Sequence, residues 1–144
     1  MSSYFPDLNV WVALTYRGHR HYGAASSWLG GMTTGTVAFC RFTQVGFLRL
    51  LTNASVMGED VKTHQEAWSI YDALLDDPRV QFCAESDSDE IEHRFRSLSA
   101  TNLPAPQQWP DAYLAAFAQA AGLTLVTFDR GLGRLAGDDV LLLE

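Results

Sequence analysis

The chain has 144 residues, of which 47% are hydrophobic, so it can form one domain with one substantial core but not two independent ones. The 10 basic and 17 acidic residues give a formal net charge of -7, which excludes an overall positive field that would attract a nucleic acid. The charge does not exclude a polyanionic substrate, because a metal ion held by clustered carboxylates supplies positive charge locally. We therefore expect one domain over residues 1–144.

The first half of the chain alternates β-prone and helical segments. In order, these are a strand at 3–7, helical segments within 8–16 and at 22–29, a strand at 35–39 and a helix at 42–53. The last helix has Phe42, Val45, Leu48 and Leu51 at three-residue intervals, which is the spacing of a buried helical face. In this half, a strand is therefore followed by a helical segment twice.

The second half repeats this alternation. In order, we predict a helix at 62–75, a strand at 80–83, a helix within 86–100, a loop at 102–110, an alanine-rich helix at 111–122, a strand at 123–128 and an apolar run at 140–143. Three prolines exclude a regular element at 102–110. Alternation at this spacing predicts an α/β fold, a three-layer αβα sandwich with a mainly parallel central sheet.

Cys40 and Cys83 are the only cysteines, and their spacing matches no metal-binding or redox motif. Buried free thiols at strand ends are favoured over a disulfide, which suits a reducing compartment. No run approaches 18 apolar residues, and the N-terminal residues lack the pattern of a secretory signal. These features predict a cytoplasmic protein with no membrane partner.

Three aspartates occupy positions suited to chemistry. Asp7 follows the first predicted strand, Asp129 follows the strand at 123–128, and Asp111 lies in the first turn of the alanine-rich helix. Side chains beyond the carboxyl ends of parallel strands meet at a common crevice. Three carboxylates with little positive charge nearby repel one another unless a cation joins them, and oxygen ligands of this kind suit Mg²⁺ or Mn²⁺.

Each aspartate also has a purely structural alternative. Asp111 can complement the dipole of its helix, and Asp129 can form a turn before Gly131. Asp7 can cap the helix that follows it, but it is the hardest to dismiss, because an unpaired buried carboxylate costs several kcal/mol. Taken singly, these are weak signals, and only their joint arrangement points to a site.

The ordered segments PDLNVWVAL, GFLRLLTN and PDAYLAAFAQAAGLTLVTFDRGLG, in a chain of this length, resemble a PIN domain of the VapC toxin type. The resemblance covers essentially the whole chain and is most specific in the C-terminal segment. It implies an αβα sandwich that acts as a metal-dependent endoribonuclease, hydrolysing RNA phosphodiesters with a metal-activated water. It also implies a homodimer that is inhibited by a cognate VapB-like antitoxin.

The resemblance assigns site residues by position. Those at matching positions are Asp7, Asn9, Gln44, Asp111, Thr127 and Asp129. Gln44 stands where the family usually has a glutamate, and neither Glu59 nor Glu66 is close enough in the sequence to replace it. An amide cannot neutralise a second Mg²⁺, so we expect one ion held by the three aspartates, with any second ion arriving with the RNA phosphate.

Other polar and aromatic residues are less specific. Candidates for phosphate contacts, each also readable as a solvated surface residue, are Arg41, Arg130, His19, Arg20 and His21. Trp11 and Trp28 can stack on a base, but their spacing favours core or dimer contacts. We interpret His64 and His93 as surface residues.

Two rivals stay open. A catalytically inactive PIN scaffold that binds RNA or antitoxin would need none of the metal chemistry. The other is a phosphate-handling α/β hydrolase or receiver-like domain in which an early aspartate is phosphorylated, and it needs a lysine near the C-terminal strand. The only lysine is Lys62, which makes that rival weak.

Overall fold

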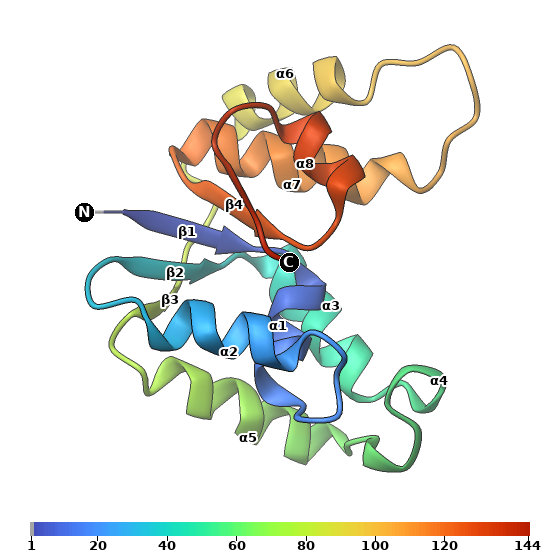
Figure 1. The fold of residues 1–144 in the computed structure, drawn as a ribbon. Helices are drawn as coiled ribbons and strands as arrows, with labels where there is room; N and C mark the ends of the chain where they lie inside the picture. Colours follow the sequence, from blue (N-terminus) through green and yellow to red (C-terminus); the bar gives the residue numbers. More distant parts are fainter. Residues whose placement is uncertain (1) are drawn as a thin grey trace.

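The computed structural model describes residues 2–144 (Figure 1). Its strands form one sheet in the order β3-β2-β1-β4-β5, and each neighbouring pair is parallel. The strands are β1 (Ser3–Pro6), β2 (Thr36–Phe39), β3 (Val80–Phe82), β4 (Thr124–Thr127) and β5 (Val140–Leu142). The first four lie within segments predicted as strands, and β5 lies within the segment predicted only as an apolar run.

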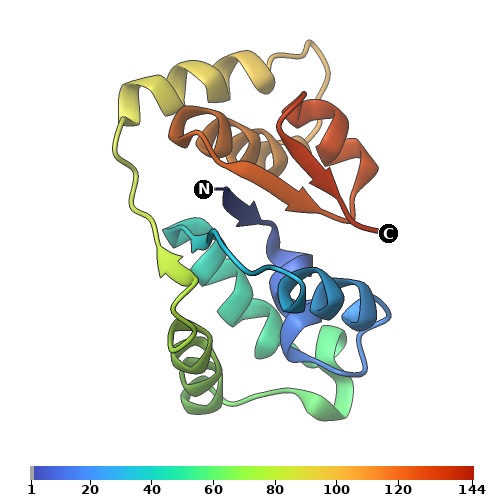
Figure 2. The ribbon, with the colours of Figure 1, turned by 60° about the vertical axis from the view of Figure 1, so that its left-hand side comes forward.

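The helices occupy both faces of this sheet. They are α1 (Leu8–Thr15), α2 (Tyr22–Gly30), α3 (Arg41–Leu51), α4 (Ala54–Met57), the 3₁₀ helix η1 (Gly58–Asp60), α5 (His64–Leu75), α6 (Ser88–Leu98), α7 (Gln108–Ala121) and α8 (Arg130–Ala136). In Figure 1, α1, α2, α3 and α5 lie below the sheet, and α6, α7 and α8 lie above it. Figure 2 shows the same separation from the side. The predicted three-layer αβα sandwich is confirmed.

Each face of the sheet has its own hydrophobic core, and alternation along β2 divides the side chains between them. Val37 and Phe39 pack with Trp11 of α1, whereas Ala38 belongs to the core beneath α7. The Trp11 ring stacks on Phe39 with centroids 3.7 Å apart, so the core interpretation of this tryptophan is confirmed. Cys40 and Cys83 follow β2 and β3 and are free thiols, as predicted, but only Cys40 is buried and Cys83 is half-buried.

The strand order places a topological switch point between β1 and β4. From β1 the chain proceeds to β2 and β3 on one side, and β4 and β5 extend the sheet on the other side. Pro6 pairs with Val126 in the parallel register, so the residues that follow each strand leave the sheet side by side. Ligands of open α/β sheets bind in the crevice at such a point, beyond the carboxyl ends of the strands.

The short helices α4 and η1 were not predicted, and two further segments differ from the sequence prediction. Residues 108–110, assigned to a loop, form the first turn of α7 instead, with Pro110 as its third residue. Proline is tolerated there because the first four N–H groups of a helix have no intrahelical partner. Helix α8 was not predicted, because Gly131 and Gly133 lower its helix propensity; burial of Leu132 and Ala136 stabilises it.

Among residues 2–144, the structure has no helix with both the length and the apolar character needed to cross a bilayer. His64 and His93 are exposed, as expected for surface residues. Trp28 is half-buried, and its ring contacts Tyr4 edge-on at 5.6 Å.

Candidate active site

Asp7 lies where β1 ends and α1 begins. Its backbone N–H donates to the Val126 carbonyl at 3.0 Å, which extends the β1–β4 pairing by one residue. Its Oδ1 accepts from the backbone N–H groups of Asn9 at 3.0 Å and Val10 at 3.2 Å, so the carboxylate caps α1. Asp7 is only 6% exposed. The capping role weighed from the sequence is therefore real, but it places a carboxylate in the interior.

Thr127, the last residue of β4, joins the two strand ends. Its hydroxyl donates to Oδ2 of Asp7 and accepts from the backbone N–H of Asp129 at 3.0 Å. Thr127 is fully buried. One hydroxyl thus fixes both the orientation of the Asp7 carboxylate and the path of the chain into Asp129.

Asp129 and Asp111 complete the acidic group. Asp129 caps α8, and its Oδ1 accepts from Gly131 N–H at 2.8 Å and Leu132 N–H at 3.2 Å. Its Oδ2 accepts no hydrogen bond from the part of the chain that is described. Asp111 lies half-buried in the first turn of α7. The turn role considered for Asp129 is replaced by a helix cap, since α8 begins at the next residue.

The three carboxylates interact electrostatically through Asp129. Burial raises the pKa of Asp7 to about 6; its hydrogen bonds lower the pKa, and the negative charge of Asp129 adds to the rise. The pKa of Asp111 is also raised, first by burial and then by Asp129. No basic residue is among the groups that shift either pKa. The strand ends therefore hold concentrated negative charge that a cation would relieve.

Beside Asp129 the surface is hollowed into a pocket of about 410 Å³. Its lining residues are Asn9, His19, Arg20, His21, Phe128 and Asp129. Asn9 is exposed, so its backbone N–H serves Asp7 while its side chain is available at the pocket. The histidine–arginine segment was considered for phosphate contacts from the sequence, whereas Phe128 gave no functional signal because it continues an apolar strand.

Comparisons with known proteins show the family and the fold. The PIN-domain family model matches residues 4–138. The chain belongs to the PIN-domain family. Ribonuclease VapC41 of Mycobacterium tuberculosis is 42% identical over 141 residues, which cover 95% of this chain and 96% of that protein. Ribonuclease VapC38 of the same organism is 30% identical over 90% of this chain and 87% of its own length. The predicted resemblance to VapC-type PIN domains is therefore confirmed.

Solved structures share the fold. The Mycobacterium tuberculosis toxin VapC20, described as cleaving the sarcin–ricin loop, superposes with a TM-score of 0.66 at 18% identity, covering 94% of this chain and 95% of that one. VapBC2 from Rickettsia felis, solved bound to a promoter DNA fragment, also gives 0.66 at 16% identity, with 99% of both chains covered. The parallel sheet of this PIN domain is thus the architecture of VapC toxins.

The PIN domain does not present a closed set of metal ligands. Within residues 2–144, no three His, Cys, Asp or Glu side chains are arranged so that they could hold one metal ion together. The donor chemistry nevertheless fits a hard divalent cation, because Asp7, Asp111 and Asp129 are oxygen ligands and none of them forms an ion pair with a basic residue within residues 2–144. For all three to bind one ion, the carboxylates must come closer together than they are in this structure.

Gln44 has different neighbours from the aspartates. It is buried in α3, and its amide oxygen accepts a hydrogen bond from Arg41. Burial raises the pKa of Tyr71 in α5, and a hydrogen bond with the Gln44 side chain partly offsets that rise. The hydrogen bonds of Asp7 run instead to Asn9, Val10 and Thr127. The assignment of Gln44 to the site by its position in the sequence remains a prediction.

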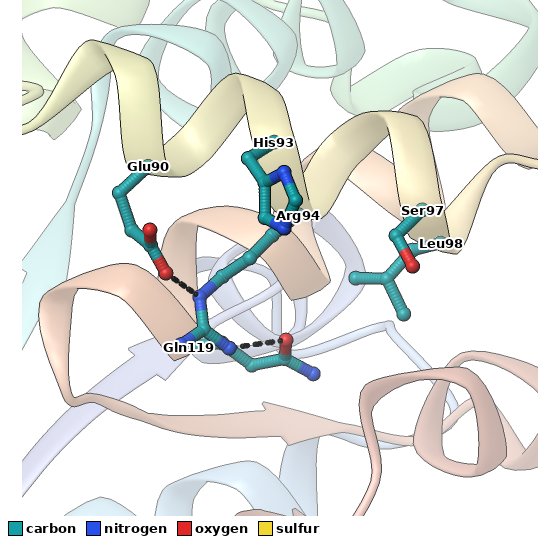
Figure 3. Close-up of a pocket in the computed structure, with 6 residues that line it drawn as sticks. All are labelled: Glu90, His93, Arg94, Ser97, Leu98 and Gln119. Atoms are coloured by element: carbon teal, nitrogen blue, oxygen red, sulfur yellow. Dashed lines mark hydrogen bonds and ion pairs between the residues drawn. The ribbon is translucent and has the colours of Figure 1, made fainter.

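A second polar depression, of about 370 Å³, lies between α6 and α7 (Figure 3). Arg94 donates to Glu90 at 2.6 Å and to Gln119 at 3.2 Å, and Gln119 donates to the Ala136 carbonyl at 2.9 Å. These polar groups satisfy one another's hydrogen-bonding capacity and connect α6, α7 and α8 of the PIN domain. We interpret the depression as part of the helix packing.

Proposed function

We propose that this PIN domain is the toxin of a VapBC-type toxin–antitoxin pair and acts in the cytoplasm as a Mg²⁺-dependent endoribonuclease, with Mn²⁺ as a substitute ion. The observation that carries the proposal is the buried Asp7 carboxylate at the switch point, with a pKa raised to about 6 and Asp129 beside it. Such a group is costly to keep charged at neutral pH, and a bound cation removes that cost. Relatives named as VapC ribonucleases support the same activity.

The three aspartates have different roles in the proposed reaction. Asp7 is held in one orientation by α1 and Thr127, while Asp111 and Asp129 approach from α7 and α8. A divalent cation bound there would lower the pKa of the attacking water and stabilise the charge that develops on the phosphate. Asp129 is the most exposed of the three, so a cation that it helps to hold would be accessible to the phosphodiester. No side-chain nucleophile is required.

The partners follow from the same family. VapBC2 was solved as a toxin–antitoxin pair, and we infer that this chain has a VapB-like antitoxin. We also propose a homodimer, which the resemblance to VapC toxins implies. The substrate proposed is RNA, because the relatives are named ribonucleases. A small gene immediately upstream in the same operon would support the antitoxin.

The decisive experiment is induced expression followed by sequencing of RNA 5′ ends. We expect growth arrest and new 5′ ends at defined sites, and we expect both to disappear in Asp111→Ala. Asp138→Ala is the matched control, because Asp138 is an exposed aspartate beyond α8 and outside the acidic group. Unchanged 5′ ends on induction of the wild-type protein would contradict the ribonuclease proposal.

The rival is an inactive PIN scaffold, and the open arrangement of the carboxylates is the observation that favours it. Purified protein separates the two. Cleavage of RNA that stops on chelation and returns with Mg²⁺ supports the enzyme, whereas RNA binding without cleavage supports the scaffold. Calorimetric titration with Mg²⁺ tests the proposal that the free protein binds one ion. Two sites of similar affinity would contradict that proposal.

A further inference from the structure

The pocket beside Asp129 is walled by the segment between α1 and α2, which has a fixed conformation. The backbone N–H of His19 donates to the Tyr16 carbonyl at 3.0 Å, and that of Tyr22 donates to the His19 carbonyl at 3.0 Å. Gly18 lies directly against the Tyr16 ring, where an added Cβ would approach to 2.6 Å. Two successive turns thus present His19, Arg20 and His21 as one unit.

Side-chain contacts fix this unit further. The His21 ring stacks on Phe128, with centroids 4.1 Å apart and planes inclined by 13°. Its Nε2 accepts from Nε of Arg20 at 3.0 Å, and its backbone N–H donates to Nδ1 of His19 at 3.0 Å. Because Phe128 lies between Thr127 and Asp129 in the chain, the unit is anchored directly to the strand end that positions the acids.

These contacts leave the charged end of Arg20 available. Its Nε is occupied by His21, but its two terminal nitrogens have no hydrogen-bond or ion-pair partner within residues 2–144. By contrast, Arg79, Arg94 and Arg96 are each paired with a carboxylate. A guanidinium whose Nε is held and whose terminal nitrogens are free presents a planar pair of donors, the geometry that suits a phosphate.

The chemistry of the pocket selects an anion over a cation. The guanidinium of Arg20 repels a metal ion, and the Nδ1 atom of His19 is already used as an acceptor. The side chain of Asn9 adds a neutral polar group at the wall nearest Asp7. Asp129 is the one negative group lining the pocket, and under the proposed function its charge is neutralised by the cation it helps to bind.

We propose that Arg20, held by His21 and Phe128, binds a backbone phosphate of the RNA next to the one that is cleaved, and so positions the strand across the acidic group. This proposal rests on the proposed function, since it assumes an RNA strand at the aspartates. Arg20 is a positioning residue that contributes to substrate binding, and His21 holds its guanidinium in place. A phosphate in the pocket of about 410 Å³ would lie beside Asp129 without displacing it.

The test compares Arg20→Ala with Arg17→Ala. Both residues are exposed arginines in the same segment, but Arg17 does not line the pocket, so the charge change is matched. Affinity for a fluorescently labelled single-stranded RNA of mixed sequence is measured by anisotropy at several salt concentrations, in protein made non-cleaving by Asp111→Asn. We expect Arg20→Ala to weaken binding roughly tenfold and to reduce the salt slope by about 0.7, the loss of one phosphate contact, with little change for Arg17→Ala.

Steady-state cleavage by the otherwise wild-type protein gives a second readout. Arg20→Ala should raise KM with kcat nearly unchanged, because a phosphate contact made in both ground and transition states is uniform binding. Arg20→Lys should recover only part of the affinity, since an ammonium lacks the planar pair of donors.

Three outcomes would overturn the proposal: equal RNA affinities for the Arg20 and Arg17 variants, a loss confined to kcat, or weakened binding of the co-expressed antitoxin with RNA binding intact. The last result would assign the pocket to the antitoxin. If the wild-type protein binds RNA but never cleaves it, the proposed function fails, and the anisotropy comparison still decides the role of Arg20.

Discussion

The hydroxyl of Thr127 donates to the carboxylate of Asp7 across the boundary between β4 and β1. The same oxygen accepts from the backbone N–H of Asp129, so a single buried atom couples two of the three proposed metal ligands. Neither residue could be placed this way by its own strand alone. The contact exists because the sheet order makes β1 and β4 neighbours although 120 residues separate the two side chains.

Replacing Thr127 with valine should impair both stability and catalysis. Valine keeps the shape but removes the hydroxyl, which leaves a buried oxygen of Asp7 without its donor and costs about 1–3 kcal/mol in unfolding free energy. The pKa of Asp7 should rise further, because that hydrogen bond lowers it. Thr127→Ser retains the hydroxyl and is the control. Chemical denaturation and cleavage rates of both variants check this; equal losses in the two would contradict it.

The metal-free protein should lose stability as pH rises through the pKa of Asp7. The folded-state pKa of about 6 lies above the ordinary value of 3.8, so the folded state binds the proton more tightly between these values. The stabilisation is therefore complete below about pH 4 and is lost by pH 6, which amounts to about 3 kcal/mol. The Asp7→Asn variant has no carboxyl group at this position, so its stability lacks this dependence on pH.

The measurement is the difference in unfolding free energy between Asp7→Asn and the wild type, in chelator, from pH 4 to pH 7. We expect the unfolding free energy of Asp7→Asn to increase relative to that of the wild type as the pH rises. Adding Mg²⁺ at pH 7 should make this difference smaller. A difference that stays constant with pH would show that Asp7 does not have a raised pKa.

The two roles of Asp129 can be separated by substitution. Asp129→Asn keeps an oxygen that can accept from Gly131 and Leu132, so α8 should remain capped, while cleavage should fall by roughly 10²-fold or more through loss of the charge. Asp129→Ala should lose the cap as well, at about 1 kcal/mol of stability. Thermal unfolding beside cleavage kinetics tests this, and full activity in Asp129→Asn would remove the residue from the site.

A carboxylate at position 44 should not create a second metal site. Gln44 accepts from Arg41 and adjoins Tyr71, so the glutamate of Gln44→Glu would form an ion pair with Arg41 in place of the present hydrogen bond. We expect the Mg²⁺ stoichiometry to be the same as in the wild type by calorimetry. An additional bound ion would show that side chain 44 reaches the aspartates after all.

The sequence predicted four of the five strands because each is a short β-prone run followed by a loop or a helical pattern, as in residues 35–39 followed by α3. It gave residues 140–143, which contain β5, only as an apolar run. It did not predict α8, because the two glycines of this segment lower its helix propensity. Contact with the rest of the domain stabilises this helix. For Asp129 it gave a turn, and not a helix cap, as the structural alternative, since a cap cannot be recognised without the helix it caps.

The sequence by itself determined the α/β alternation, because that depends on residue type and spacing along the chain. Its resemblance to VapC-type PIN domains identified the family and made the three aspartates the candidate site residues. Only the tertiary structure decided which groups meet. The β1–β4 pairing buries Asp7 under Thr127, α3 directs Gln44 toward Arg41, and the segment after α1 brings Arg20 and His21 to Phe128. Contacts between residues distant in the chain follow from strand order and packing, which local sequence patterns do not encode.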